Sequence, residues 1–276
     1  MAQIIGGIGI SHVPAIGGAI ARGLQNDPYW APFFGPVRNA QRWVAAVQPD
    51  AVVVVYNDHG LNFFLNAMPT FAVGACRSYH NEDEGWGLPV QAARKGDPDL
   101  SWRLIDGLVA RDFDITICQE MLIDHACTVP LSLLWPDGDA PPIVPVAVNI
   151  VQHPMPSPRR CFALGQAIGD ILAAEPSDRR ILVLGTGGLS HQLEGSRAGF
   201  INREFDELCL NALAGSPERL LSYSSTDLAE LAGSQGVEVL NWLVMRGALP
   251  GAAHEVLRNY HVPISNTASG LLVLAA

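Results

Sequence analysis

Lysine is nearly absent from this chain of 276 residues: Lys95 is the only one, and the other basic residues are arginines scattered along the sequence. Acidic residues outnumber basic ones by 27 to 17, so the formal net charge is −10. A surface of that sign repels the phosphates of nucleic acids and of anionic lipids, and no basic run offsets it. We therefore expect neither a nucleic acid nor a membrane as a partner.

Long apolar runs and paired cysteines are also missing. The sequence holds no stretch of 18 apolar residues, so no membrane-spanning helix is expected. The five cysteines are odd in number, widely spaced and without a C-x-x-C pair. This pattern indicates neither a disulfide framework nor a zinc–thiolate site. Reduced cysteines that pack as small apolar side chains fit a cytoplasmic protein, which is the expected location.

The chain has enough apolar residues, 49% of its length, for a large core. Short β-branched segments predict strands at 4–10, 51–56, 70–74, 114–118, 143–149, 181–184 and 270–274. Amphipathic segments predict helices at 37–47, 100–111, 127–134, 159–174, 200–214, 226–231, 237–246 and 252–259. This alternation predicts an α/β fold, a single domain over residues 1–276 with a central, mostly parallel (mixed) sheet flanked by helices on both faces.

Three histidines follow predicted strands. His12 and His59 each stand just after an apolar run, and His191 follows a third run through a glycine-rich turn. The carboxyl ends of parallel strands are where open α/β sheets hold ligands, so these imidazoles can converge. The pattern predicts a metal site, with His12 and His59 as its imidazole pair and His191 as a base beside it.

Glu238 is the best candidate for a carboxylate ligand, because it is the only acid in the apolar helix predicted at 237–246. An unpaired buried carboxylate is costly, and a divalent cation relieves that cost. Two histidines and one carboxylate leave coordination positions open, as in non-haem Fe(II) sites. Asp58 is expected to point away from His59 and to have a supporting or structural role. Asn57 could orient a substrate or a ligand, or be an ordinary turn residue.

The segment after the second predicted strand reads as irregular. Residues 60–86 contain an acidic part at 81–86 that we expect to be exposed, and that suits a lid or a contact surface. His80 in this segment, His153 among prolines and His254 on the helix predicted at 252–259 are interpreted as solvated side chains.

Motifs along almost the whole chain resemble the class III extradiol ring-cleaving dioxygenases, and within them the large (beta) subunits of protocatechuate 4,5-dioxygenases. The resemblance rests on seven segments that occur in order: 11–15, 56–59, 83–87, 124–131, 185–192, 236–238 and 260–267. So many matching segments in order make the resemblance specific.

The resemblance implies an activity and a site. An Fe(II) ion would be held by three residues: His12, His59 and Glu238. His191 would be the catalytic acid/base and His125 a second active-site histidine, while Ser265 and Thr267 would lie near the carboxylate of the aromatic acid. The implied reaction is cleavage of protocatechuate by O2 at the 4,5 bond. The implied assembly is a hetero-oligomer in which a separate small helical alpha subunit covers the site.

Other functions stay open at this point. Gallate or another catechol could be the substrate within the same family. Two histidines and a carboxylate also suit zinc with a bound water, so a metal-dependent hydrolase is an alternative. A non-catalytic subunit ranks last, because every expected ligand type is present. Ser265 and Thr267 could equally make ordinary loop hydrogen bonds, and His125 could be only a helix-start residue.

Overall fold

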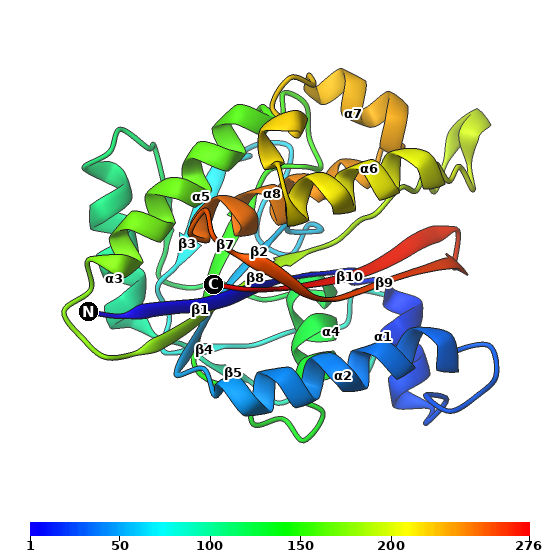
Figure 1. Ribbon diagram of the computed structural model, residues 1–276, viewed down its shortest axis with the longest axis horizontal. Helices are drawn as coiled ribbons and strands as arrows, with labels where there is room; N and C mark the ends of the chain where they lie inside the picture. The colour runs from blue at the N-terminus through cyan, green and yellow to red at the C-terminus, as the bar shows by residue number, and fades with distance from the viewer.

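The chain folds around one eight-stranded sheet (Figure 1). The computed structural model describes the backbone of residues 1–276 and every side chain except those of Pro263 and Ile264. In chain order the strands are β1 (Gln3–Ile10), β2 (Ala51–Tyr56), β3 (Phe71–Gly74), β6 (Thr116–Cys118), β7 (Ile143–Val148), β8 (Arg180–Thr186), β9 (His254–Ile264) and β10 (Thr267–Ala275). Two short strands, β4 (Ser78–Tyr79) and β5 (Arg94–Lys95), form a separate ribbon.

The sheet is parallel at its centre and mixed toward its edges. Its strand order is β6-β3-β7-β2-β8-β1-β10-β9. The four central strands, β7, β2, β8 and β1, are parallel to one another. β3 is antiparallel to β7, and β10 is antiparallel to β1. The predicted fold class, a mostly parallel mixed sheet in an α/β protein, is therefore confirmed.

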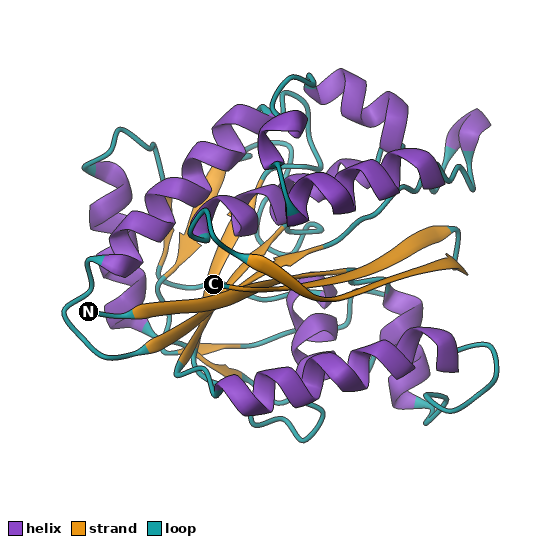
Figure 2. Cartoon of the chain, in the orientation of Figure 1, coloured by secondary structure: helices purple, strands orange, loops and turns teal.

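Helices cover both faces of the sheet (Figure 2). They are α1 (Pro14–Ala21), α2 (Ala31–Val47), α3 (Pro98–Val109), α4 (His125–Leu134), α5 (Pro158–Ala173), α6 (Arg203–Ala214), α7 (Ser225–Ala232) and α8 (Val239–Ala248). Successive strand residues point to opposite faces. Val53 and Val55 of β2 therefore pack with α3, α5, α6 and α8, whereas Val52 and Val54 pack with α1, α2 and α4.

The helix predicted at 252–259 is wrong, because residues 254–259 belong to β9. Leu257 and Tyr260 are three residues apart, which suggests one face of a helix. Instead they lie opposite Val273 and Gly270 of β10 in an antiparallel pair. β9 is an edge strand whose exposed and partly buried residues lack the alternation that identifies a strand. His254 is exposed, as expected, but at the start of this strand.

Helix α1 has no counterpart among the predicted helices. Gly17 and Gly18 lower its intrinsic helix propensity, although Pro14 at its start favours a helix beginning there. None of the helices that the structure describes is long and apolar enough to cross a membrane.

Candidate active site

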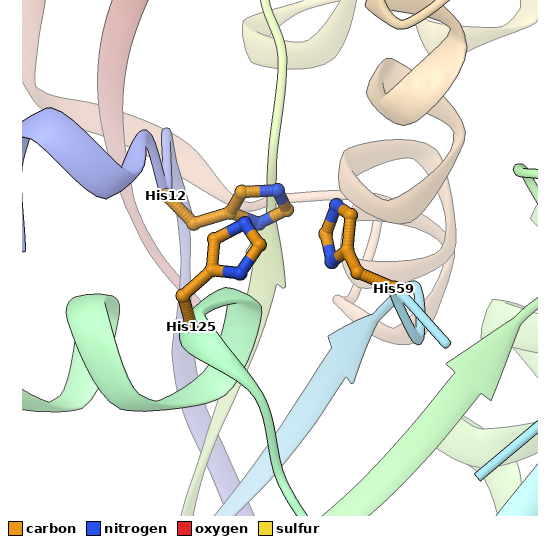
Figure 3. Close-up of side chains that lie close together, drawn as sticks. All are labelled: His12, His59 and His125. Carbon is orange, nitrogen blue, oxygen red and sulfur yellow. The ribbon is translucent and has the colours of Figure 1, made fainter. Parts of the chain in front are cut away.

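A cavity of about 180 Å³ lies where β1, β2 and β8 end. These three strands are neighbours in the order β2-β8-β1, so the segments that follow them meet at one edge of the sheet. Six of the residues that line the cavity carry its chemistry: His12, His59, Trp86, His125, His191 and Glu238. Figure 3 shows three of the imidazoles, which come from the ends of β1 and β2 and from the start of α4 and point toward one another.

His12 is held in a fixed position directly after β1. The hydroxyl of Ser11 donates a hydrogen bond to the carbonyl of Gly188 and accepts one, at 2.8 Å, from the backbone N–H of Gly270. The Nδ1 of His12 lies 3.2 Å from the hydroxyl of Thr186 at the end of β8. Its Nε2 therefore faces the carboxylate of Glu238, 3.2 Å from Oε1.

His59 is oriented by a buried carboxylate. One oxygen of Asp124 lies 2.9 Å from Nδ1 of His59 and accepts the backbone N–H of the same residue at 2.7 Å. The Nε2 of His59 lies 3.6 Å from Oε1 of Glu238. Burial alone would lower the pKa of His59, but Asp124 and Glu238 outweigh it and raise this pKa to about 10. Burial would likewise raise the pKa of Asp124, yet His59 lowers it to about 2.

Glu238 lies at the end of the short helix η3 (Gly236–Glu238), immediately before α8, and only 5% of it is exposed. Its Oε2 accepts the backbone N–H of Gly188 at 2.7 Å. Gly187 has a φ of +105°, and a Cβ there would lie 2.7 Å from the Glu238 side chain, so this turn requires glycine. Burial would raise the pKa of Glu238, but His12 and His59 hold it well below the usual range. Glu238 is therefore an ionised carboxylate.

These donor atoms fit a divalent metal ion. The Nε2 atoms of His12 and His59 face one oxygen of Glu238, a set of two imidazoles and one carboxylate that suits Fe(II), and zinc as well. The other nitrogen of each ring is engaged by Thr186 or Asp124, the outer contacts that orient metal-binding histidines. His12, His59 and His125 also offer ring nitrogens within 4.8 Å of one another, a second possible ligand set that shares two members.

His191 is suited to act as a base. It follows β8 and the Gly187–Gly188 turn, and its Nδ1 lies 2.9 Å from the carbonyl oxygen of Leu189. A carbonyl only accepts hydrogen bonds, so Nδ1 carries the proton and a neutral His191 has its lone pair on Nε2. That Nε2 lies 3.9 Å from Oε2 of Glu238, next to the donor atoms described above.

His125, the first residue of α4, contacts a carboxylate that sequence reasoning missed. Glu84 lies with one oxygen 2.6 Å from Nδ1 of His125 and accepts the backbone N–H of His125 with the other at 2.7 Å. The ring of His125 lies beside that of His59, with 4.2 Å between their centroids. Burial, and then the proximity of His59, lowers the pKa of His125. The ring is therefore neutral near pH 7.

Asp124 was also missed, although a sequence signal for it exists. It is an aspartate directly before a helix, and its second oxygen accepts the N–H of Ala126, the contact of an N-terminal cap. Nothing in the sequence says that the first oxygen holds His59. Glu84 lies in the acidic segment 81–86 that we expected to be exposed, but it is partly buried against His125. Only the motif at 83–87 draws attention to Glu84.

The remaining site residues lie on two sides of the cavity. Asn57 is 1% exposed and lies behind Glu238, where its amide donates to Oε1 at 3.1 Å and its carbonyl accepts from Asn241 at 3.0 Å. Ser265 and Thr267 line the cavity, at the turn between β9 and β10. The three predicted metal ligands and His191 thus come together. Ser265 and Thr267 line the same cavity, whereas Asn57 contacts Glu238 but does not line the cavity.

Asp58 points away from His59, as its place in the strand suggested. Its carboxylate accepts the backbone N–H groups of Gly60, Asn62 and Phe63 at 3.1–3.2 Å and shapes the turn that follows β2.

A central parallel sheet with two histidines after its strands, and a buried carboxylate that faces both, defines an α/β protein with a candidate metal site at one edge of the sheet. The family described as the catalytic LigB subunit of aromatic ring-opening dioxygenase matches residues 6–270, and the chain belongs to this family. This membership agrees with the resemblance that the sequence motifs indicate.

Two curated relatives and one solved structure give the extent of the similarity. The gallate dioxygenase of Pseudomonas putida KT2440 is 36% identical over 180 residues, which are 64% of this chain and 53% of that protein. A 2,3-dihydroxyphenylpropionate/2,3-dihydroxicinnamic acid 1,2-dioxygenase of Burkholderia vietnamiensis G4 is 37% identical over 155 residues, 56% of this chain and 47% of that protein. The chain therefore spans about half the length of these relatives.

The crystal structure of an uncharacterized protein from Escherichia coli K12 superposes with a TM-score of 0.64. The superposition covers 98% of this chain and 99% of that one at 16% sequence identity. At this identity the likeness extends to the fold alone.

Proposed function

We propose that the protein is a non-haem Fe(II) dioxygenase that opens the ring of protocatechuate (3,4-dihydroxybenzoate) with O2 at the 4,5 bond. One observation carries the proposal: Nε2 of His12 and Nε2 of His59 face the same oxygen of the ionised Glu238, with His191 beside them. Family membership supports the reaction type. The names of the two relatives, which mention gallate and dihydroxyphenylpropionate, support a dihydroxy aromatic acid as the substrate.

The metal would supply chemistry that the side chains of the cavity lack. Bound by His12, His59 and Glu238, Fe(II) would supply Lewis acidity toward the catechol oxygens and a path for electrons from the catecholate to O2. Glu238 completes this ligand set because its buried, ionised carboxylate needs a cation.

The histidines of the chain would handle the protons. Nε2 of His191 takes a proton from a catechol hydroxyl and later returns it to the ring-opened product, since the contact between Nδ1 and Leu189 leaves Nε2 as the acceptor. His125 hydrogen-bonds a substrate oxygen through its own Nε2, because Glu84 engages Nδ1. Ser265 and Thr267 line the cavity, and their hydroxyls would donate hydrogen bonds to the substrate carboxylate, Thr267 in place of its 3.4 Å contact with the carbonyl of Ser265.

Oxygen uptake in the presence of protocatechuate tests the proposal. Protein reconstituted anaerobically with Fe(II) should consume O2 and build up a yellow ring-opened product. No turnover of any catechol by iron-loaded protein, with its partner present, would contradict it. Activity that persists without O2, with zinc as the isolated metal, would instead favour the metal-dependent hydrolase.

Gallate is the second candidate substrate, favoured by the relative named gallate dioxygenase. The ratio of kcat/KM for gallate to that for protocatechuate, measured on one preparation, separates the two acids. A ratio well above one would replace protocatechuate in the proposal.

We also propose the setting in which this activity takes place. Residues 1–276 act as one catalytic domain in the cytoplasm, and a separate small helical subunit covers the cavity in a hetero-oligomer. Trp86 and Leu193 line the cavity and are 58% and 47% exposed, which suits a covering chain.

A further inference from the structure

A closed loop brings Glu84 to the cavity. We call residues 81–91 the Glu84 loop. Its two ends are joined by Asn81 and Gln91: the amide of Asn81 donates to the carbonyl of Gln91 at 3.1 Å, and its side-chain oxygen accepts the N–H of Gln91 at 2.8 Å. Leu88 packs against the core on the α1 side, where a Cβ added to Gly17 would lie 2.8 Å from it. The base and one flank of the loop are therefore anchored away from the cavity.

Glu84 anchors the tip of this loop to His125. Its two oxygens contact the Nδ1 and the backbone N–H of that residue, at 2.6 and 2.7 Å. The backbone N–H belongs to the first residue of α4 and has no partner within the helix, so the carboxylate also helps to cap that helix. The side chain of Glu84 thus contacts the start of α4 and the ring of His125, and it holds the Glu84 loop against both.

The contact determines which nitrogen of His125 faces the cavity as an acceptor. An ionised carboxylate only accepts hydrogen bonds, so Nδ1 of His125 carries the proton and Nε2 carries the lone pair. The ring lies against those of His12 and His59, with centroids 5.3 and 4.2 Å away, and Figure 3 shows all three rings gathered at one point.

The contact between Glu84 and His125 also helps to fix the position of Trp86 at the cavity. Trp86 stands two residues after Glu84, between Gly85 and Gly87, whose φ angles are +79° and +71°. Two glycine turns let the chain reverse on either side and present the indole at the loop tip. The Trp86 ring lies 6.3 Å from that of His125 between centroids and lines the cavity.

We propose that Glu84 is a positioning residue, which holds His125 with its Nε2 lone pair toward the substrate and keeps Trp86 at the cavity. The role of Glu84 in turnover rests on the ring cleavage proposed above. The effect of Glu84 on the tautomer of His125 and on the loop is independent of that proposed reaction.

The matched variants are Glu84→Gln, Glu84→Ala and Glu82→Gln. Glutamine keeps the size of Glu84 but replaces one of its two acceptor oxygens by an NH2 donor, so it loses the present arrangement in which each oxygen accepts one N–H of His125. Glu82→Gln makes the same chemical change two residues away, at an exposed position of the same loop. All three are compared with the unchanged chain.

Nitrogen-15 NMR of the histidine rings reads the tautomer directly in chelator-treated protein, with a His125→Gln variant to assign the signal. The unchanged chain should give the Nδ1–H tautomer, and Glu84→Gln should move the population toward Nε2–H. Hydrogen exchange of peptides covering 81–91 should accelerate in Glu84→Ala and stay unchanged in Glu82→Gln. In iron-loaded protein, Glu84→Gln should lower kcat about 10- to 100-fold with a much smaller change in KM.

The outcomes separate the two proposals. If neither the unchanged chain nor any variant converts a catechol, the proposed function is wrong. The NMR and hydrogen-exchange data then still show whether Glu84 sets the tautomer of His125 and holds the loop. If ring cleavage proceeds but Glu84→Gln leaves the His125 tautomer and kcat as they are in Glu82→Gln, the positioning role is wrong. An Nε2–H tautomer in the unchanged chain would also overturn it.

Discussion

His191 and His12 lie in one cavity, but their ring nitrogens have different partners. Nδ1 of His191 donates to a backbone carbonyl, whereas Nδ1 of His12 contacts a hydroxyl and its Nε2 faces Glu238 at 3.2 Å. The first arrangement suits a group that exchanges a proton with substrate. The second suits a ligand whose orientation is fixed from behind. The two histidines thus have different expected roles because their ring nitrogens have different partners.

This difference predicts opposite effects of two alanine substitutions. His191→Ala should keep iron and lose about 10²- to 10⁴-fold in kcat, the usual contribution of a general acid or base. His12→Ala should fail to retain iron, because one of three ligands is gone. Iron content and O2 uptake measured on the same samples check both. His254→Ala, on the exposed start of β9, is the control. Loss of metal by the His191 variant would contradict its role as a base.

Replacing Asp124 by asparagine should lower the affinity for metal and leave helix α4 intact. Asparagine is as good an N-terminal cap as aspartate, so Asp124→Asn should leave the start of α4 intact. It removes the negative charge that holds Nδ1 of His59, and the affinity for Fe(II) should fall about 10- to 100-fold. Competition with a chelator of known affinity measures the change. Unchanged affinity would mean that Asp124 only caps the helix.

The same pair predicts a pH dependence in metal-free protein. The pKa of His59 rises from the ordinary 6.5 to about 10, so the folded state holds this proton more tightly than the unfolded state. The resulting stabilisation is complete below pH 6.5 and is lost as the pH rises toward 10. The free energy of unfolding in urea should therefore decline over this range, and the decline should be smaller in Asp124→Asn. An equal decline in both proteins would assign it to other groups.

At the scale of elements, the turn after β8 depends on helix α8. Trp242 of α8 is fully buried, and its indole N–H donates to the carbonyl of Gly187 at 2.9 Å. Trp242→Phe removes this donor and leaves a buried carbonyl without its partner, which costs about 1–3 kcal/mol. Urea denaturation should report that loss. Trp102→Phe on α3, where the ring is 37% exposed, should have a much smaller effect. Equal stability of both variants would contradict a structural role for this bond.

Some helices and strands could be predicted from the sequence pattern, and others could not. The strands that precede His12 and His59 are buried apolar runs. The sequence predicts these strands well, because burial on both faces leaves a clear signal. The sequence of β9 resembles a helix because an edge strand has a weak pattern of burial. Glu238 was placed in a helix and lies in the short η3 turn before it. Glu84 could not be found from periodicity, because its role depends on a loop folding back onto α4.

At the scale of the whole molecule, strand order creates the site. β8 lies between β2 and β1, so the residues after three strands that are distant in sequence reach one cavity. A sequence can indicate that strand ends hold ligands, but it does not give the order of the strands. The convergence of positions 12, 59, 191 and 238 is therefore what the structure adds.

A subunit that covers the cavity would contact the exposed apolar side chains that line it, and substitutions there test for such a contact. Trp86 and Leu193 are large, apolar and exposed side chains that line the cavity, and such a surface suits contact with a second chain. If a second chain covers them, the isolated protein should be poorly active, and adding that chain should raise O2 uptake. Leu193→Ser should reduce the stimulation and leave the iron content unchanged. Val109→Ser at the end of α3, where the side chain is 54% exposed, is the matched control and should leave the stimulation intact. Full activity of the monodisperse isolated chain would show that this cavity needs no cover from a partner.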